Sequence, residues 1–138
     1  MTGTGVATAA PEHVDGARLL ARIDALAEIS PIPGGGNSRL ALTDDDRDGR
    51  DLVVGWMREL GLEVAIDVVG NVVGTWPVGR GAPVMMGSHI DTVRTGGRYD
   101  GNLGVLAGLE VIESCQRAGD RKSTRLNSSH VSESRMPS

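Results

Sequence analysis

The residues best suited to chemistry lie close together in residues 87–104, which read GSHIDTVRTGGRYDGNLG. This stretch holds one histidine, His89, and two aspartates, Asp91 and Asp100, among several glycines. Imidazole nitrogen and carboxylate oxygen are ligands that zinc binds in proteins. Residues two apart on a strand point to the same side, so Asp91 could hold one ring nitrogen of His89 while the other nitrogen faces a metal ion. The spacing therefore indicates a candidate metal site.

The same stretch also has a purely structural interpretation. Asp100 precedes the apolar segment that begins GNLG, and an aspartate there is a good N-cap for a helix. A single histidine near the end of a strand is commonly held by ordinary protein hydrogen bonds, and the pattern H-x-D is short and common. Spacing alone therefore leaves a metal site and a glycine-rich turn both open.

Two apolar segments on either side would position these residues. The segment PVMMGSHI is almost continuously apolar, which predicts a short strand covered on both faces. The segment NLGVLAGLEVIESC is apolar around most of its circumference, which predicts a deeply buried helix that ends at Gly119. In open α/β sheets ligands bind beyond the carboxyl ends of the strands, which is where His89 and Asp100 would lie.

The upstream chain supplies further elements. Asp15 is a plausible N-cap for a first helix, and Thr43 with Asp46 three residues on resembles a capping box for a second helix, which Gly61 would end. PIPGGGNSRL is expected to be a loop between them. Two β-branched runs around Gly70–Asn71 predict a hairpin. The order helix, helix, hairpin, buried strand, buried helix predicts an α/β fold with helices packed on a mixed sheet.

Composition divides the chain into three regions. Residues 1–14 are small and polar and are expected to be mobile. Residues 15–119 contain all the predicted elements and form one region. Residues 120–138 are rich in serine and are expected to be disordered, and we interpret them as a tail that the native gene does not encode.

Charge and residue usage exclude several classes of protein. The net charge of −4 provides no basic field for nucleic acid. The single cysteine, Cys115, cannot form an internal disulfide and is expected to be a buried helix residue rather than a catalytic thiol. No apolar stretch approaches the length of a membrane span, and no secretory signal is visible. These features predict a cytoplasmic protein that binds neither nucleic acid nor membrane.

The segments VMMGSHIDTV and GGRYDGNLGVLAGLEV together resemble the first metal-binding segment of the zinc-dependent amidase/hydantoinase/carbamoylase family. That family includes N-carbamoyl-L-amino-acid hydrolases and allantoate amidohydrolases, and it is related to di-zinc aminoacylases and carboxypeptidases. The resemblance extends over roughly residues 19–119. It implies that the chain is the leading part of a di-zinc aminopeptidase/carboxypeptidase-like catalytic domain.

The resemblance implies a role for each candidate residue. His89 would bind one metal ion, and Asp100 would bridge two. Asp91 would be the catalytic residue that orients His89. The two ions of the complete enzyme would be Zn²⁺, with Mn²⁺, Co²⁺ or Ni²⁺ as alternatives. In such relatives the peptide bond after the bridging aspartate is often cis, which makes the Asp100–Gly101 bond a candidate.

The implied function is hydrolysis of a linear amide or ureido C–N bond in a small molecule, such as an N-carbamoyl-L-amino acid or allantoate, by an enzyme that is a homodimer when complete. The family pattern also needs a glutamate pair and two more histidines, and residues 104–119 contain none of them: Glu110 lies on the buried helix, and Glu113 is expected at a solvated edge. The chain should therefore be inactive alone. An aminoacylase or peptidase of the same superfamily and a metal-free remnant are the alternatives.

Overall fold

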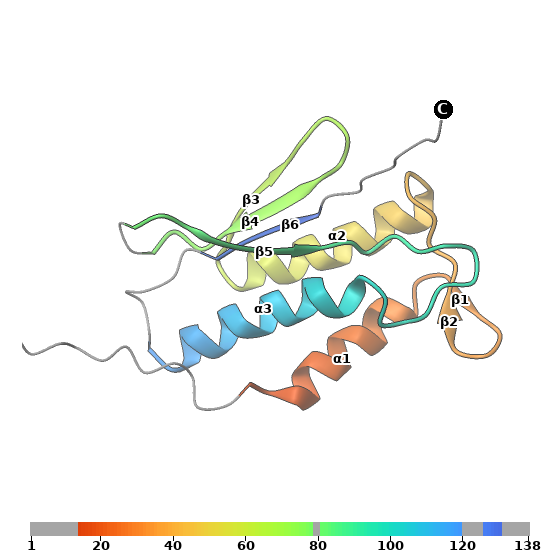
Figure 1. Cartoon of the computed structure of the whole chain (residues 1–138), viewed down its shortest axis with the longest axis horizontal. Coiled ribbons are helices and arrows are strands. Elements are labelled where there is room, and N and C mark those ends of the chain that lie inside the picture. The colour runs from red at the N-terminus through yellow and green to blue at the C-terminus, as the bar shows by residue number, and fades with distance from the viewer. Residues whose placement is uncertain (1–13, 79–80, 120–125, 131–138) are drawn as a thin grey trace, which may run out of the picture.

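Local capping residues mark where the first two helices of this protein begin. The computed structural model describes residues 14–78, 81–119 and 126–130. Its elements, in chain order, are α1 (Gly16–Ala27), β1 (Pro31–Ile32), β2 (Gly36–Asn37), α2 (Asp44–Glu59), β3 (Glu63–Ile66), β4 (Val72–Thr75), β5 (Val84–Ser88), α3 (Asn102–Arg117) and β6 (Leu126–His130) (Figure 1).

The predicted caps of the first two helices are confirmed. The Asp15 carboxylate accepts a hydrogen bond from the Arg18 N–H at 3.0 Å, and the Thr43 hydroxyl accepts one from the Asp46 N–H at 3.3 Å. The Asp46 carboxylate reaches the N–H of Leu42 rather than that of Thr43, so the reciprocal half of the capping box is displaced by one residue. Each cap satisfies main-chain donors that a helix leaves unpaired.

The main sheet is mixed, as predicted. Its strand order is β3-β4-β6-β5, with β3/β4 and β4/β6 antiparallel and β5/β6 parallel. The hairpin predicted around Gly70–Asn71 joins β3 and β4, and the Asp67 carboxylate closes its turn by accepting from the N–H groups of Val69 and Asn71. The α/β fold class with helices packed on a mixed sheet is therefore confirmed.

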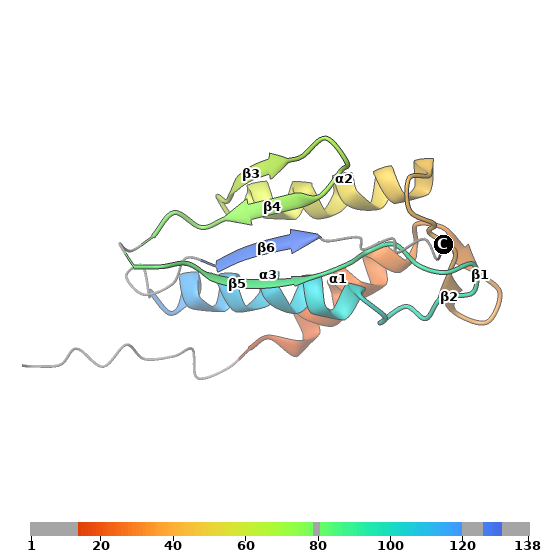
Figure 2. The same cartoon turned by 45° about the horizontal axis from the view of Figure 1, so that its top comes forward.

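The helices of the described residues lie on one side of this sheet. Figures 1 and 2 show α2 and α3 along one face, with α1 packed against α3 on the side away from the strands. Burial of apolar surface between these layers is the main stabilising contribution. The buried apolar residues are Ile23, Leu26, Val53, Val54, Met57, Leu62, Val72, Trp76, Ile90, Val105, Leu106, Leu109, Ile112 and Cys115.

The prediction that β5 is covered on both faces is wrong. Met86 packs against the core, whereas Met85, which points to the opposite face, is 60% exposed. The reason is that the helices of the described residues cover only one face of the sheet. The side chains of β5 that point to the opposite face therefore have no helix over them. The deep burial predicted for α3 is confirmed, because ten of its residues are buried.

Two segments expected to lack regular structure contain short strands. In PIPGGGNSRL, β1 and β2 pair as a minimal antiparallel hairpin. Within residues 120–138, predicted to be disordered, the segment Leu126–His130 forms β6 between β4 and β5, because main-chain hydrogen bonding to both neighbours does not depend on apolar side chains. The remaining residues of that tail and residues 1–13 lie outside the described residues. The non-native origin of the tail stays a prediction.

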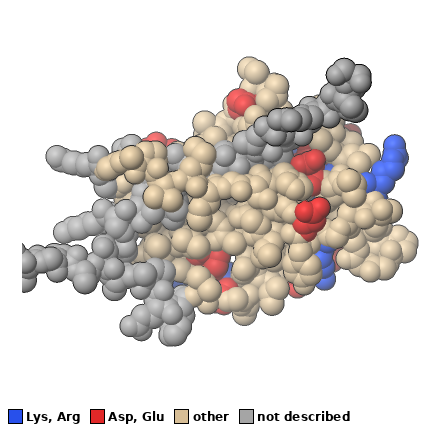
Figure 3. Space-filling view, in the orientation of Figure 1, with Lys and Arg blue, Asp and Glu red and all other residues tan. Residues whose placement is uncertain are grey.

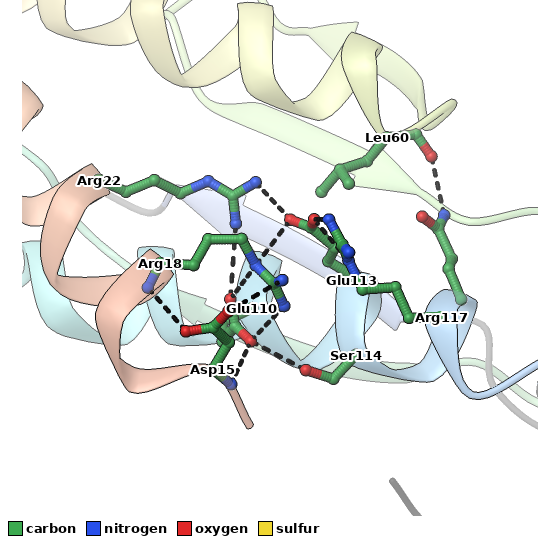
Figure 4. Close-up of polar contacts among 9 residues, drawn as sticks. Asp15, Arg18, Arg22, Leu60, Glu110, Glu113, Ser114 and Arg117 are labelled. Atoms are coloured by element: carbon green, nitrogen blue, oxygen red, sulfur yellow. Dashed lines mark hydrogen bonds and ion pairs between the residues drawn. The ribbon is translucent and has the colours of Figure 1, made fainter. Parts of the chain in front are cut away.

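A network of buried ion pairs joins α1 to α3 (Figure 4). Arg18 donates to Glu110 at 2.6 and 2.8 Å, and Arg22 donates to Glu113 at 2.6 Å. Arg117 adds a second cation beside Glu113 at 2.7 Å. The expectation that Glu113 lies at a solvated edge is wrong, since its exposed fraction is 7% and that of Glu110 is 1%. Their partners on α1 are distant in the sequence, so local patterning gave no sign of them.

The pKa values of both glutamates are lowered by this network. Burial alone would raise the pKa of Glu110, but the hydrogen bonds from Arg18, the Asp15 N–H and Ser114 outweigh that effect. Burial likewise opposes the shift at Glu113, where hydrogen bonds from Arg117 and Arg22 outweigh it and lower the pKa.

We expect this network to make stability depend on acid pH. A carboxyl group whose pKa is lower in the folded state stabilises the protein fully above its ordinary pKa, here 4.5, and this contribution is lost as pH falls through the folded-state value. Urea unfolding midpoints should therefore be constant from pH 7 to about 5.5 and should fall steadily below pH 4.5. Glu110→Gln should flatten the acid limb of this profile. An unchanged acid limb in that variant would contradict the assignment.

The charged side chains visible on one face of the protein are dispersed. On the face shown in Figure 3, acidic side chains are scattered among uncharged residues, in keeping with the net charge of −4. Within the ranges that the structure describes, no helix combines the length and the apolar character needed to cross a membrane.

Candidate metal centre

The loop of residues 89–101 leads from the carboxyl end of β5 to the start of α3, beside the β1–β2 hairpin (Figure 1). The hairpin pins this loop, since Asn37 and Gly96 exchange two main-chain hydrogen bonds of 2.9 Å each. A salt bridge between Arg98 and Asp24 also ties the loop to α1. The segment that carries the candidate site is thus anchored to two elements outside the main sheet.

His89 lies one residue beyond β5 and its ring is held in one orientation. Its Nδ1 lies 2.9 Å from the main-chain carbonyl oxygen of Asp91. A carbonyl can only accept a hydrogen bond, so in the neutral ring Nδ1 carries the proton and Nε2 presents its lone pair. Nε2 lies 4.0 Å from Oδ1 of Asp100. The structure therefore brings Nε2 of His89, the ring nitrogen that carries the lone pair, close to the Asp100 carboxylate.

Asp91 contacts His89 as predicted, but mainly through a different atom. The carboxylate oxygen Oδ1 lies 3.4 Å from His89 Nδ1, whereas the main-chain carbonyl oxygen of the same residue is closer, at 2.9 Å. Both groups favour a proton on Nδ1. The reason for the difference is that the chain leaves β5 at Ser88, so the two residues no longer have the strand geometry on which the prediction relied.

Asp100 does not cap α3, so the structural alternative for this residue is wrong. The N-cap of α3 is Gly101, and no side chain caps the helix by a hydrogen bond. The Asp100 side chain is 74% exposed and faces His89. The expectation of a cis peptide bond at Asp100–Gly101 is also wrong, because the described residues contain no cis bond.

A tight turn at Gly101 directs Asp100 back toward the histidine. The N–H of Asn102 donates to the carbonyl oxygen of Asp100 at 2.8 Å, and Gly101 has φ 69° and ψ −48°. This is the geometry of a γ-turn with positive φ, which L residues other than glycine rarely adopt. A Cβ atom at Gly101 would also lie 2.5 Å from both Nδ1 and Cε1 of His89. Only glycine fits between the turn and the ring.

The pair fits a divalent metal ion in its chemistry. Zinc binds imidazole nitrogen and carboxylate oxygen at about 2.0–2.2 Å each, so an ion between the two atoms spans about 4 Å. A lone pair and a carboxylate that converge without a proton between them are suited to a cation. Among residues 14–78 and 81–119, however, no group of three or more His, Cys, Asp or Glu side chains gathers around one point. The described residues thus bring together one imidazole and one carboxylate at this point, fewer protein donors than a zinc site uses.

Sequence reasoning missed three residues behind the site. Arg39 is completely buried and donates to the carbonyl oxygen of Ile90 and to Oδ1 of Asn102. The Thr92 N–H donates to the Arg39 carbonyl oxygen at 2.6 Å. Arginine is almost never fully buried unless it is paired, so composition places it at the surface. The apolar residues that follow Arg39 are the only local sign of its burial.

These features define the class of protein: it is an α/β protein in which helices cover one face of a mixed sheet. A histidine and two aspartates, which are residue types that can bind metal ions, lie beyond the carboxyl end of one strand at the edge of the sheet. The same fold occurs in a tripeptidase from Staphylococcus aureus, which aligns with a TM-score of 0.66 over 85% of this chain at 18% identity. That likeness shows the fold alone.

More similar proteins give the family. No family model matches the chain. An N-carbamoyl-L-amino acid amidohydrolase of Geobacillus stearothermophilus is 43% identical over 110 residues, which is 77% of this chain and 26% of that protein. An allantoate amidohydrolase of Bacillus subtilis is 36% identical over 119 residues, which is 72% of this chain and 29% of that protein. The crystal structure of a hydantoinase/carbamoylase family amidase from Burkholderia ambifaria aligns with a TM-score of 0.79 at 46% identity, over 85% of this chain and 29% of that one.

Over most of its length the chain is thus similar to amidases of the hydantoinase/carbamoylase family. It spans about a quarter of the length of the curated relatives that it matches. The resemblance noted in the sequence is therefore confirmed.

Proposed function

We propose that this chain supplies half of the metal centre of a zinc-dependent amidohydrolase that acts on N-carbamoyl-L-amino acids or allantoate. The observation that carries the proposal is the approach of His89 Nε2 to Asp100 Oδ1, with Nδ1 of the same ring held by Asp91. His89 and Asp100 would be metal ligands, and Asp91 would orient His89. The printed names of the relatives support the substrate class.

Each residue has a distinct task in this proposal. A bound zinc pair would supply Lewis acidity to the substrate carbonyl and make a water molecule a better nucleophile. Asp91 holds the proton on Nδ1 and so keeps Nε2 available as a ligand atom. The Asp100 carboxylate has two oxygens and is exposed enough to bridge two ions. Gly101 keeps the space beside the His89 ring open.

The chain alone is proposed to be inactive. Catalytic zinc sites use three protein ligands or more, and the described residues supply two together with no general base beside them. We further propose that the complete enzyme is a cytoplasmic homodimer that takes small-molecule substrates and binds neither nucleic acid nor membrane.

A segment exchange tests the proposal. Residues 15–119 would replace the matching segment of the Geobacillus stearothermophilus amidohydrolase, and hydrolysis of an N-carbamoyl-L-amino acid would be assayed with the zinc content. We expect the hybrid to bind zinc and to hydrolyse its substrate. His89→Ala or Asp100→Ala should lower the rate more than about 100-fold, since even residues that only support a metal ligand are worth 10–100-fold.

A neighbouring variant serves as the control. Ser88→Ala alters the residue before His89 without touching a proposed ligand, and it should leave the activity of the hybrid unchanged. A folded hybrid that holds no zinc, or one whose activity survives His89→Ala, would favour a metal-free remnant and overturn the proposal. Hydrolysis of ureido substrates by the purified 138-residue chain would overturn the proposed inactivity.

A further inference from the structure

Arg39 is the most deeply buried charged side chain near the candidate site. It follows β2, and its exposed fraction is 0%. Within the described residues its guanidinium donates four hydrogen bonds, all to neutral acceptors: the carbonyl oxygens of Ile90, Leu26 and Ile29 and the side-chain oxygen of Asn102, at 2.9–3.1 Å. A cation held by neutral acceptors in the interior needs each of these bonds, because burial removes its water.

The acceptors lie on both sides of the candidate metal pair. Ile90 is the residue between His89 and Asp91, and its carbonyl accepts from Arg39 Nε at 2.9 Å. Asn102 follows Asp100 by two residues and is the first residue of α3; its Oδ1 accepts from Arg39 at 3.1 Å. The rigid, planar guanidinium of Arg39 therefore donates hydrogen bonds to a residue close in sequence to each candidate ligand, Ile90 next to His89 and Asn102 two residues after Asp100.

The main chain of Arg39 makes the same connection. Its N–H donates to the Thr92 hydroxyl at 2.7 Å, and its carbonyl oxygen accepts from the Thr92 N–H at 2.6 Å. The side-chain Nδ2 of Asn102 in turn donates to the main-chain carbonyl oxygen of Arg98 at 3.1 Å. This hydrogen bond fixes the loop before Asp100. The loop of residues 89–101 is thus held at both ends through Arg39.

The surroundings are shaped for arginine. A Cβ atom at Gly49 in α2 would lie 2.8 Å from Cδ of Arg39, so the helix is open only because a glycine faces this side chain. Burial lowers the pKa of the Arg39 guanidinium, with nearby aspartates including Asp91 opposing that effect. Arginine keeps its charge under such conditions where lysine would readily lose it.

We propose that Arg39 is a positioning residue that sets the orientation of the His89 imidazole and its separation from the Asp100 carboxylate. The proposal rests on the proposed function for its consequence, metal affinity, but its geometric part concerns the protein alone. Lysine could not replace this arginine, since one ammonium group cannot reach the carbonyl of Ile90 and the amide of Asn102 with the same fork.

The test uses the whole chain labelled with ¹⁵N in its histidines. Imidazole nitrogen resonances, assigned with His89→Ala, report which ring nitrogen of His89 carries the proton, and a Zn²⁺ titration reports the affinity at the same atoms. In the unchanged chain we expect a single tautomer with the proton on Nδ1. In Arg39→Met we expect both tautomers to be populated and the Zn²⁺ affinity to fall at least tenfold, with only partial recovery in Arg39→Lys.

The matched control is a second, partly buried arginine that contacts the other end of α3. Arg22 bonds Glu113 at 2.6 Å in the network between α1 and α3, so Arg22→Met should lower stability without altering the His89 tautomer or the Zn²⁺ affinity. Equal effects of Arg22→Met and Arg39→Met on His89 would overturn the proposal, as would a folded Arg39→Met chain with an unaltered ring.

Two further outcomes are separable. If circular dichroism shows that Arg39→Met does not fold, Asn102→Ala removes one acceptor of the same fork, and mixed tautomers or an unaltered ring in that variant decide the question in the same way. If the hybrid with the Geobacillus stearothermophilus amidohydrolase holds no zinc, the proposed function fails, while the positioning role of Arg39 is still decided by the His89 tautomers of this chain.

Discussion

Gly101→Ala is expected to displace the His89 ring and to destabilise the protein by about 2–5 kcal/mol, combining backbone strain with overpacking. The added methyl group would overlap the main-chain carbonyl oxygen of His89 and would lie 2.5 Å from Nδ1 and Cε1 of its ring, and the backbone already has φ 69°. The main chain and the ring of His89 would both have to shift, so the ring would leave the carbonyl oxygen of Asp91 and Nε2 would lose its fixed direction toward Asp100. Urea unfolding measures the first effect, and the ¹⁵N resonances of the imidazole measure the second.

Gly61→Ala separates the clash from the strain. Gly61 has φ 71°, close to the value at Gly101, but a Cβ atom there meets nothing within 4 Å. We expect that variant to lose only about 1–2 kcal/mol for the left-handed backbone and to keep the His89 tautomer of the unchanged protein. If Gly101→Ala and Gly61→Ala lost the same stability and both kept that tautomer, the close contact with His89 would have no importance for the site.

The parts of the fold that the sequence predicts well are those that depend on neighbouring residues. Asp15 and Thr43 act as caps because their side chains reach N–H groups three residues on, and no distant contact is needed. The hairpin around Gly70–Asn71 is likewise local, since Asp67 closes its own turn. Element type was therefore accessible for these segments from residue type and period alone.

The candidate site was partly accessible for a similar reason. His89 and Asp91 are two residues apart, and the glycines before Asp100 allow the chain to return, so their proximity follows from a short loop. The atoms that make the contact were not accessible. Whether Asp91 holds the ring by its carboxylate or by its carbonyl depends on where β5 ends, and strand ends are the least certain feature of a sequence pattern.

The buried charged residues that sequence reasoning missed have partners distant in the chain. Arg39 contacts Ile90 and Asn102, 51 and 63 residues away, and Arg18 contacts Glu110, 92 residues away. A charged side chain is assigned to the surface by default because burying it without a partner is unfavourable. The partners exist here, but only the packing of α1, α3 and the loop after β5 creates them.

Glu110→Ala is expected to lower the free energy of unfolding by about 3 kcal/mol, because removing one partner of a buried ion pair weakens the compensation of the other charge. Arg18 would keep only Glu113 at 3.1 Å and Asp15 at 3.4 Å. Glu110 is 1% exposed and accepts from Arg18, the Asp15 N–H and the Ser114 hydroxyl. The change would therefore leave several donors of the α1–α3 interface without their acceptor. A domain of this size has a total stability of about 5–15 kcal/mol, so the loss should be evident as a large shift of the urea midpoint.

The exposed ion pair between Asp44 and Arg47 in α2 is the matched control, since its side chains are 87% and 55% exposed. Asp44→Ala should leave the urea midpoint nearly unchanged, because water and salt weaken such a pair. A double-mutant cycle of Glu110→Ala with Arg18→Met then isolates the pair: if the two residues act through each other, the double variant is much less destabilised than the sum of the single ones. Additive losses, or a loss below about 1 kcal/mol in Glu110→Ala, would mean that the pair of Arg18 and Glu110 does not hold α1 to α3. Hydrophobic packing of Ile23 and Leu26 would then fix α1, the helix to which Arg98 of the loop of residues 89–101 is tied.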